Sequence, residues 1–289
     1  MIRKRLITIG FAGIYIRFIL PSEVNVPREL STFLCEDTAD LVAEYRVVLI
    51  NDPLVLTGPP LSQYMGMEVY DYQGQQLRLY PILTEKDGCQ VACLLSDTGE
   101  NILYYPASRW KFYADEWHCL HLIGVETVLL RTQSFLLHSS VVMKNGLIVL
   151  FSGPSGMGKS TQAALWERYL GAEILNGDRC IVKKTEAGFI GCGSPWCGTS
   201  GIYRQEQAPI RGIFVLRQAQ GNSVRRVGIE GFSKLFQQCI VNSWDEMFVM
   251  KLTELLMELL ERIPVYELAC RPDEEAVQLA YNTVFGGVV

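Results

Sequence analysis

Residues 153–160 read Gly-Pro-Ser-Gly-Met-Gly-Lys-Ser and constrain the fold of this chain more than any other segment. They match the pattern G-x-x-x-x-G-K-[ST] of a phosphate-binding loop. The apolar run 147–151 before them is typical of a buried strand. Residues 161–170 after them contain no glycine or proline and favour a helix. A strand, a glycine loop and a helix in this order predict an α/β fold that binds a phosphorylated ligand.

The composition of the loop agrees with phosphate binding. Consecutive backbone N–H groups and the positive end of a helix together attract anionic oxygens. In such loops the lysine contacts the β- and γ-phosphates and the serine hydroxyl coordinates Mg²⁺, roles that fall here to Lys159 and Ser160. We therefore expect ATP and Mg²⁺ as cofactors. The expected nucleotide-binding residues are Gly153, Ser155, Gly156, Met157, Gly158, Lys159, Ser160 and Thr161.

The charge of the chain disfavours nucleic acid as the main partner. Its 289 residues carry a formal net charge of −5, and no basic tail is present. Five arginines nevertheless occur in a segment with a single acid, Glu206. These arginines form either a solvated face or a site for phosphates or an acidic acceptor; they are Arg204, Arg211, Arg217, Arg225 and Arg226.

The N-terminus superficially resembles a signal peptide because Arg3-Lys4-Arg5 precedes apolar residues. The uncharged run 6–16 is short, Arg17 interrupts it, and no clear cleavage site follows. A hairpin around residues 11–13 fits this segment better. No stretch has the 18 or more apolar residues of a membrane helix, so we expect a cytoplasmic protein without a membrane partner.

The nine cysteines are scattered and form no C-x-x-C pair, which favours reduced and mostly buried thiols. His118, Cys119 and His121 have donor atoms that suit a metal, but no second pair of ligands at the usual spacing accompanies them. Packing in a helix is therefore the favoured interpretation of this cluster.

The pattern of apolar and turn residues predicts two domains. Alternating residues at 41–47 and several short segments bounded by glycine turns indicate a β-rich accessory domain at residues 1–108. The second domain, residues 109–289, contains the glycine loop. Expected strands are 67–72, 76–82, 89–95, 102–105, 135–143, 213–216 and 265–268; expected helices lie near 28–35, over 117–131 and 233–262, and from 272 onward.

Three segments in order resemble HPr kinase/phosphorylase-like proteins, whose phosphate loop is related to that of phosphoenolpyruvate carboxykinase. They are Leu137-His138-Ser139-Ser140, the loop 153–161, and Leu175-Asn-Gly-Asp-Arg179. The run 193–203, Gly-Ser-Pro-Trp-Cys-Gly-Thr-Ser-Gly-Ile-Tyr, is similar to a divergent branch of that family. The resemblance covers residues 131–289. It implies an α/β P-loop kinase core of the HPr kinase/phosphoenolpyruvate carboxykinase type, with the β-rich domain outside it.

The resemblance also implies roles for individual residues. The family has two adjacent acids where this chain has Gly177-Asp178, so Asp178 matches the metal-binding acid and the acid associated with the acceptor is missing. His138 then becomes the candidate base, since imidazole titrates near neutral pH. Catalytic residues are thus expected to be His138, Lys159 and Asp178, with Ser160 and Asp178 at the metal. A half-buried structural histidine and a turn aspartate are the alternatives at these two positions.

These features together predict an ATP-dependent kinase that phosphorylates a serine-type hydroxyl of a peptide, protein or small molecule. Two alternatives stay open. Gly177 favours a regulatory nucleotide-binding module with little catalysis, and a simple ATPase would use the same loop. The segment 195–199 lies in a loop with glycines at 191, 193, 198 and 201, and it either closes over a ligand or packs under a turn. A homo-oligomer is compatible with the sequence.

Overall fold

A computed structural model describes residues 5–21, 28–36, 38, 40–64, 66–84, 86, 88–112 and 122–286. The chain is mixed α/β and divides into two compact units, Met1–Val128 and Leu129–Val289. The division falls later than the boundary expected at 108/109, because residues 122–128 pack on the N-terminal sheet. The hydroxyl of Tyr45 donates to the carbonyl of Ile123 at 2.7 Å, and buried Arg78 forms an ion pair with Glu126.

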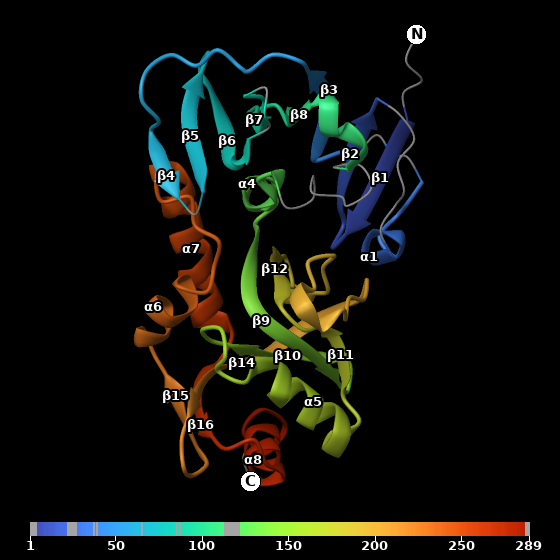
Figure 1. The fold of residues 1–289 in the computed structure, drawn as a ribbon. Helices are drawn as coiled ribbons and strands as arrows, with labels where there is room; N and C mark the ends of the chain where they lie inside the picture. Colours follow the sequence, from blue (N-terminus) through green and yellow to red (C-terminus); the bar gives the residue numbers. More distant parts are fainter. Residues whose placement is uncertain are drawn as a thin grey trace. The chain divides into compact units, whose positions relative to one another are not determined.

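The N-terminal unit is built on an eight-stranded sheet with strand order β1-β2-β3-β8-β7-β6-β5-β4 (Figure 1). Ala12 and Gly13 have positive φ and form the turn of the β1–β2 hairpin, which confirms the hairpin expected around residues 11–13. The elements are β1 Arg5–Phe11, β2 Ile14–Leu20, α1 Arg28–Ser31, β3 Ala43–Ile50, β4 Ser62–Tyr64, β5 Met67–Tyr72, β6 Gln75–Thr84, β7 Gln90–Leu95 and β8 Glu100–Pro106.

The C-terminal unit begins within helix α4 and contains the glycine loop. Its helices are α4 Val125–Arg131, α5 Lys159–Leu170, α6 Glu230–Phe236, α7 Glu246–Arg262 and α8 Glu274–Phe285. Its strands are β9 Ser134–Lys144, β10 Leu147–Ser152, β11 Glu173–Asn176, β12 Arg179–Thr185, β13 Gly188–Cys192, β14 Gln207–Gln218, β15 Ser223–Val227 and β16 Val265–Cys270.

Two long strands, β9 and β14, organise the C-terminal unit because each takes part in two sheets. One half of β9 pairs with β12 and the other with β10 and β11. Similarly, β14 pairs antiparallel with β13 and parallel with β10 and β16. The parallel strands β10, β14 and β16 consequently end at the same edge, which is where ligands bind in many α/β sheets.

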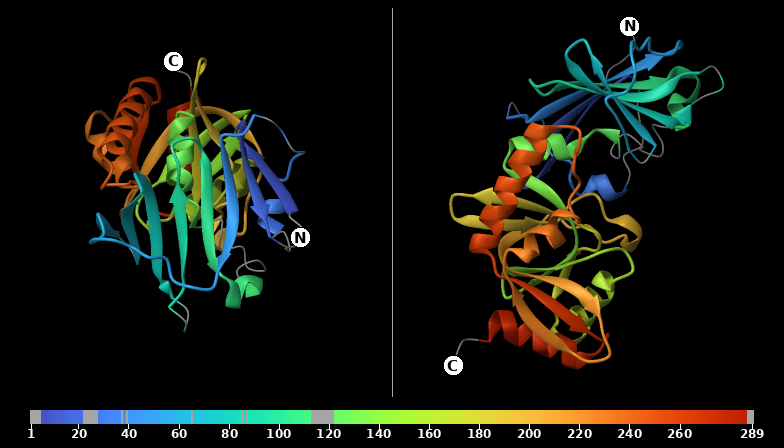
Figure 2. Two further views of the ribbon diagram at one scale, coloured as in Figure 1. Left: turned by 90° about the horizontal axis from the view of Figure 1, so that it is seen from above. Right: turned by 90° about the vertical axis from the view of Figure 1, so that its left-hand side faces the viewer.

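Two apolar cores cover opposite faces of the sheet that contains β10 and β14. One core packs Phe151 and Phe214 of the strands against Trp166 of α5 and Val277 of α8. The other includes Leu150 and packs against α7, which lies far from α8 in the right-hand view of Figure 2. Helices α7 and α8 begin at side-chain caps: Asp245 accepts from the backbone N–H of Phe248 at α7, and Asp273 accepts from that of Ala276 at α8. The two cores fix the sheet edge on which the glycine loop lies.

The structure corrects several expected elements. Within the described part of 117–131, regular α4 covers only Val125–Arg131, because Gly124 has φ of 59°. The helical region 233–262 is broken into α6 and α7 by residues 237–245. Strands β4, β12, β13 and β15 were not expected. The expected strands 67–72, 76–82, 102–105, 135–143, 213–216 and 265–268 fall within strands of the structure, and the expected strand 89–95 begins one residue before β7.

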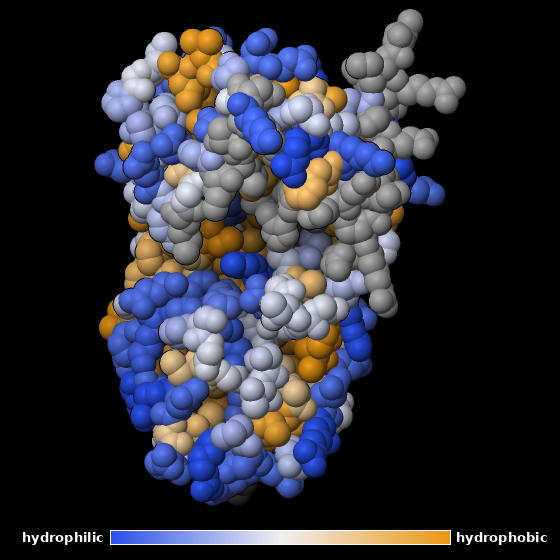
Figure 3. All heavy atoms as spheres, viewed as in Figure 1, coloured by the Kyte–Doolittle hydropathy of each residue, from blue (hydrophilic) through white to orange (hydrophobic). Residues whose placement is uncertain are grey.

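The described helices include none that is long and apolar enough to cross a membrane. The face of the C-terminal unit seen in Figure 3 is mainly hydrophilic, with apolar residues in small groups. All eight described cysteines are free thiols, and five of them are buried.

Candidate functional site

The glycine loop connects the buried end of β10 to the start of α5. Gly156 and Gly158 have φ of 78° and 101°, a region that residues with a side chain rarely adopt. Gly158 is the N-cap of α5 and provides no side-chain cap for the first helical turn. The backbone N–H groups of that turn are therefore available to an anion, with the positive end of the helix dipole behind them.

Lys159, the loop lysine, is buried although it carries an ammonium group. The residue is 7% exposed, and its Nζ donates to the carbonyls of Gly153 at 2.9 Å and Pro154 at 3.1 Å. Burial lowers the pKa of Lys159, and the nearby carboxylate of Asp178 opposes this shift. The loop thus holds a cation close to its open amides, which favours binding of a multiply charged anion.

A pocket of about 460 Å³ lies beside the loop and brings together the residues that the sequence analysis assigned to one site. His138 enters from β9, Lys159 and Ser160 from the start of α5, and Asp178 from the turn after β11. The remaining lining residues are Ser155, Gly156, Gly158, Thr161, Gly177, Cys197, Thr199 and Ser200. Of the expected loop residues, Gly153 and Met157 do not line this pocket.

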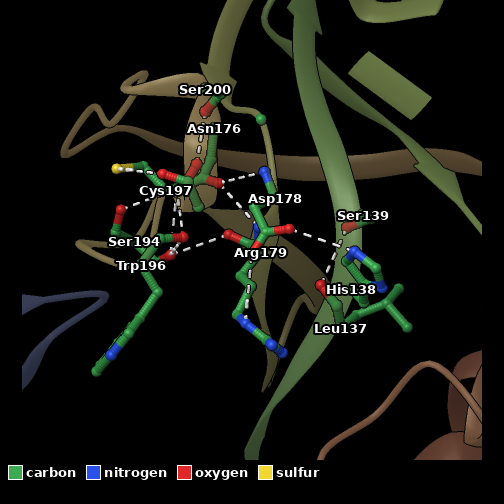
Figure 4. A network of polar contacts seen from close by, with 12 residues as sticks. Leu137, His138, Ser139, Asn176, Asp178, Arg179, Ser194, Trp196, Cys197 and Ser200 are labelled. Atoms are coloured by element: carbon green, nitrogen blue, oxygen red, sulfur yellow. Dashed lines mark hydrogen bonds and ion pairs between the residues drawn. The ribbon is translucent and has the colours of Figure 1, made fainter. Parts of the chain in front are cut away.

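His138 and Asp178 face each other across the β9–β12 pairing, in which His138 is opposite Arg179 (Figure 4). The Nε2 atom of His138 lies 3.2 Å from Oδ1 of Asp178, and Nε of Arg179 lies 3.4 Å from Oδ2. The hydrogen bond from His138 is the largest cause of a lowered pKa at Asp178; Arg179 and Lys159 add to it. Asp178 is therefore an ionised carboxylate near neutral pH.

Asn176, which the sequence analysis did not single out, fixes the turn that carries Asp178. Its Oδ1 accepts from the backbone N–H groups of Asp178 and Arg179, both at 2.8 Å. Its Nδ2 donates to the carbonyls of Ser194 at 2.9 Å and Trp196 at 3.3 Å. The side chain is fully buried, so it connects the Asp178 turn rigidly to segment 194–197 (Figure 4). An asparagine two residues before an aspartate is a turn signal, and that was the available clue.

Ser200 lies against Gly177 and leaves no room for a side chain at position 177. A Cβ atom added to Gly177 would overlap with Cβ and Oγ of Ser200. The hydroxyl of Ser200 in turn donates to the carbonyl of Cys197 at 2.6 Å and accepts from the backbone of Ile202 at 3.2 Å. Ser200 therefore occupies the space that a side chain at position 177 would need.

The donor set of the pocket is compatible with Mg²⁺. Mg²⁺ takes oxygen ligands and commonly uses one or two protein groups together with phosphates and water. Ser160 and Asp178 supply a hydroxyl and an ionised carboxylate to the same pocket, and Ser160 Oγ has no hydrogen-bond partner among the described residues. No group of three or more His, Cys, Asp or Glu side chains suited to a metal occurs in the described residues. The metal would thus depend on the phosphates for further ligands.

The other segments singled out from the sequence do not form one site. The five arginines are dispersed: Arg204 pairs with Glu173, Arg211 donates to the carbonyl of Val284, and Arg217 and Arg225 pair with Glu267. Trp196 and Cys197 are buried, whereas Gly198 and Thr199 are exposed, and Cys197 and Thr199 line the pocket. His118, Cys119 and His121 lie outside the described residues.

No protein-family model and no curated protein matches the chain. Among solved structures, the Hpr(Ser) kinase/phosphatase from Coxiella burnetii has a weak structural similarity, with a TM-score of 0.32 and 15% sequence identity. The match covers 51% of this chain and 89% of that chain.

Proposed function

We propose that the chain is an ATP-dependent kinase of the HPr kinase type that phosphorylates a serine-type hydroxyl of a peptide, protein or small molecule. One observation carries the proposal. A single pocket at the start of α5 contains a buried ammonium at Lys159, the hydroxyl of Ser160, the ionised carboxylate of Asp178 and the imidazole of His138. A phosphoryl-transfer site needs these groups, because it works chiefly by positioning and charge neutralisation.

Each group has a role in this proposal. Lys159 and the open amides of the first turn of α5 bind the β- and γ-phosphates and stabilise the charge that develops on the transferred phosphoryl group. Ser160 and Asp178 would hold Mg²⁺, which supplies further neutralisation of phosphate charge when it is bound. Asn176 keeps Asp178 in place through its two backbone hydrogen bonds.

His138 is the proposed general base. If Nε2–H of His138 donates to Asp178, as the 3.2 Å separation allows, Nδ1 is the nitrogen that accepts the proton of the acceptor hydroxyl. Asp178 then orients the imidazole and stabilises the imidazolium form. Since Ser200 fills the space next to Gly177, a side chain at position 177 cannot act as the base, and we assign that role to His138.

A regulatory module that binds ATP with little turnover is the second candidate, and Gly177 is the observation that favours it. Production of ADP by the full chain separates the candidates when it is measured with and without peptides or small molecules that carry a serine-type hydroxyl. Acceptor-dependent ADP supports the kinase. Binding without turnover supports the module, and turnover that ignores the acceptor supports an ATPase.

Lys159→Ala tests the phosphate site. We expect a loss of roughly 100-fold or more in nucleotide-dependent activity, the usual effect of removing a group that stabilises transition-state charge. Lys251→Ala, which removes an exposed lysine of α7, is the matched control and should retain activity. Unchanged turnover in Lys159→Ala would exclude this loop as the site of the reaction.

Two substitutions separate the base role of His138 from a positioning role. His138→Ala should slow acceptor phosphorylation by about 100-fold or more and leave ATP affinity nearly unchanged. His138→Gln retains a donor for Asp178 but has no basic nitrogen, so it should be equally slow. Recovery of activity in His138→Gln would mark His138 as a residue that only positions Asp178.

A further inference from the structure

A second pocket, of about 550 Å³, lies directly beside the phosphate pocket. The two share Gly156, Gly158 and Thr161, so the glycine loop and the start of α5 form a continuous floor beneath both. The second pocket extends away from His138 and Asp178, toward the ends of β14 and β16. Its volume is within the range of about 300–1,000 Å³ that is usual for small-molecule sites.

The parallel arrangement of three strands determines where this pocket lies. The strands β10, β14 and β16 are parallel, so the glycine loop after β10 meets Gln218 at the end of β14 and Cys270 at the end of β16. The Nε2 atom of Gln218 donates to the carbonyl of Gly156 at 3.1 Å and ties the loop to the neighbouring strand. The pocket is thus a part of the carboxyl edge of the sheet, where α/β folds bind their ligands.

A buried amide with an unmet hydrogen bond lines the pocket. Gln162, in the first turns of α5, is 2% exposed, and its Nε2 donates to Sγ of Cys270 at 3.3 Å. Its Oε1 is buried and has no hydrogen-bond partner among the described residues. A buried acceptor without a donor is unfavourable because it has lost its hydrogen bonds to water, and a ligand N–H or O–H group would restore one.

A fixed guanidinium lies at the rim. Nε of Arg271 donates to Asp273 at 2.9 Å, and Nη2 donates to Glu275 at 3.2 Å, while the side chain stays 50% exposed. These two acids hold the guanidinium plane in one orientation. A planar, fixed guanidinium stacks favourably on a flat aromatic ring, and apolar atoms of Met157 and Pro272 lie in the same pocket lining.

We infer that the second pocket holds the nucleoside half of the nucleotide. The base stacks on Arg271, a donor of the base or ribose pairs with Gln162, and the phosphates cross Gly156 and Gly158 into the first pocket. This assignment rests on the proposed function, since it presumes that the phosphate pocket binds the triphosphate. It adds a site for base and ribose, to which neither His138 nor Asp178 contributes.

Binding of two probes to the full chain tests the inference: MgATP and magnesium tripolyphosphate, each measured by calorimetry. We expect the native chain to bind MgATP about 10-fold or more tightly than tripolyphosphate, since stacking of the base adds to the binding of the phosphates. Arg271→Ala and Gln162→Met should each reduce this preference about 3- to 10-fold and leave tripolyphosphate affinity unchanged. Arg262→Ala removes an exposed arginine of α7 outside the pocket and should preserve the preference.

The outcomes distinguish the two proposals. An unchanged preference for ATP in both variants, with tripolyphosphate still bound, would overturn the nucleoside pocket and leave the phosphate site intact. Failure of the native chain to bind either ATP or tripolyphosphate would overturn both proposals. Because Arg271 is exposed, its variant tests the inference even if Gln162→Met does not fold.

Discussion

Ser200 and Gly177 form a close contact in which each residue restricts what the other position can be. A Cβ at 177 would overlap with Ser200, which two hydrogen bonds hold in place. Gly177 does not have a positive φ, so lack of space is the constraint and backbone strain is not.

Gly177→Ala should therefore lower the free energy of unfolding by about 1–3 kcal/mol, the usual cost of overpacking. In the Ser200→Gly background the same change should cost much less, because the opposing Cβ and Oγ are gone. Urea denaturation of the two single variants and the double variant gives the coupling energy, which we expect to be about 1–3 kcal/mol. Gly221→Ala is the control, since a Cβ at Gly221 contacts nothing. Strictly additive effects would contradict the steric explanation.

At the residue scale, prediction from sequence succeeded where a few consecutive residues form a recognisable pattern. The loop 153–160 and the turn at Asp178 each have a short sequence pattern, and the structure brings Lys159, Ser160 and Asp178 into one pocket with His138. Asn176 and Ser200 were missed because their importance arises from hydrogen bonds and contacts between segments about 20 residues apart, such as that of Asn176 with Trp196. No short pattern encodes those contacts.

At the scale of elements, an ion-pair cluster joins three strands and a helix of the C-terminal unit. Glu267 of β16 is 13% exposed and contacts Arg217 of β14, Arg225 of β15 and Lys234 of α6. The hydrogen bond from Lys234 is the main cause of a lowered pKa at Glu267, and Arg225 lowers it further. This one carboxylate connects the edge strand β15 to the rest of the sheet.

The sign of the shift determines the pH dependence. The folded pKa of Glu267 lies below its ordinary value of 4.5, so its stabilisation is complete above that value and disappears as pH falls through the folded pKa. Between about pH 5 and about pH 3, Glu267→Gln should therefore lose less unfolding free energy than the native chain. Denaturation curves at several pH values measure the difference. Glu254→Gln, at an exposed position of α7, is the control, and equal losses in the Glu267 variant and the native chain would contradict the prediction.

Prediction of elements from sequence succeeded where the apolar pattern was strong. Strand β10 is a run of buried residues, and the turn after β9 has positive φ at Asn145 and Gly146, the conformation typical of an Asn-Gly hairpin turn. Of the strands that were missed, β4 is only three residues long, β13 begins with a glycine and has another in its interior, and the others carry charged residues. Strand β15 reads Ser-Val-Arg-Arg-Val and is largely exposed, and its pairing with β16 is reinforced by the ion pair of Arg225 with Glu267. Such tertiary charge pairing is invisible in a single segment.

At the scale of the whole molecule, each unit has an apolar core of its own. The N-terminal sheet buries Phe18, Tyr45 and Tyr105 completely, and the C-terminal unit packs one core around Leu150 and another around Trp166. All residues of both proposed ligand pockets belong to the C-terminal unit. A ligand that binds there stabilises that unit directly.

We therefore expect two unfolding transitions in calorimetry of the full chain, only one of which responds to MgATP. A ligand at about 100 times its dissociation constant adds about 2.7 kcal/mol to the stability of the unit that binds it, so the transition of the C-terminal unit should move to higher temperature. Lys159→Ala should abolish the shift, because the phosphate contact is lost, while both transitions remain. If MgATP instead moved the two transitions together, the units would be energetically coupled and their cores would not melt independently. That result would mean that nucleotide binding also stabilises the N-terminal sheet, although none of its described residues lines either pocket.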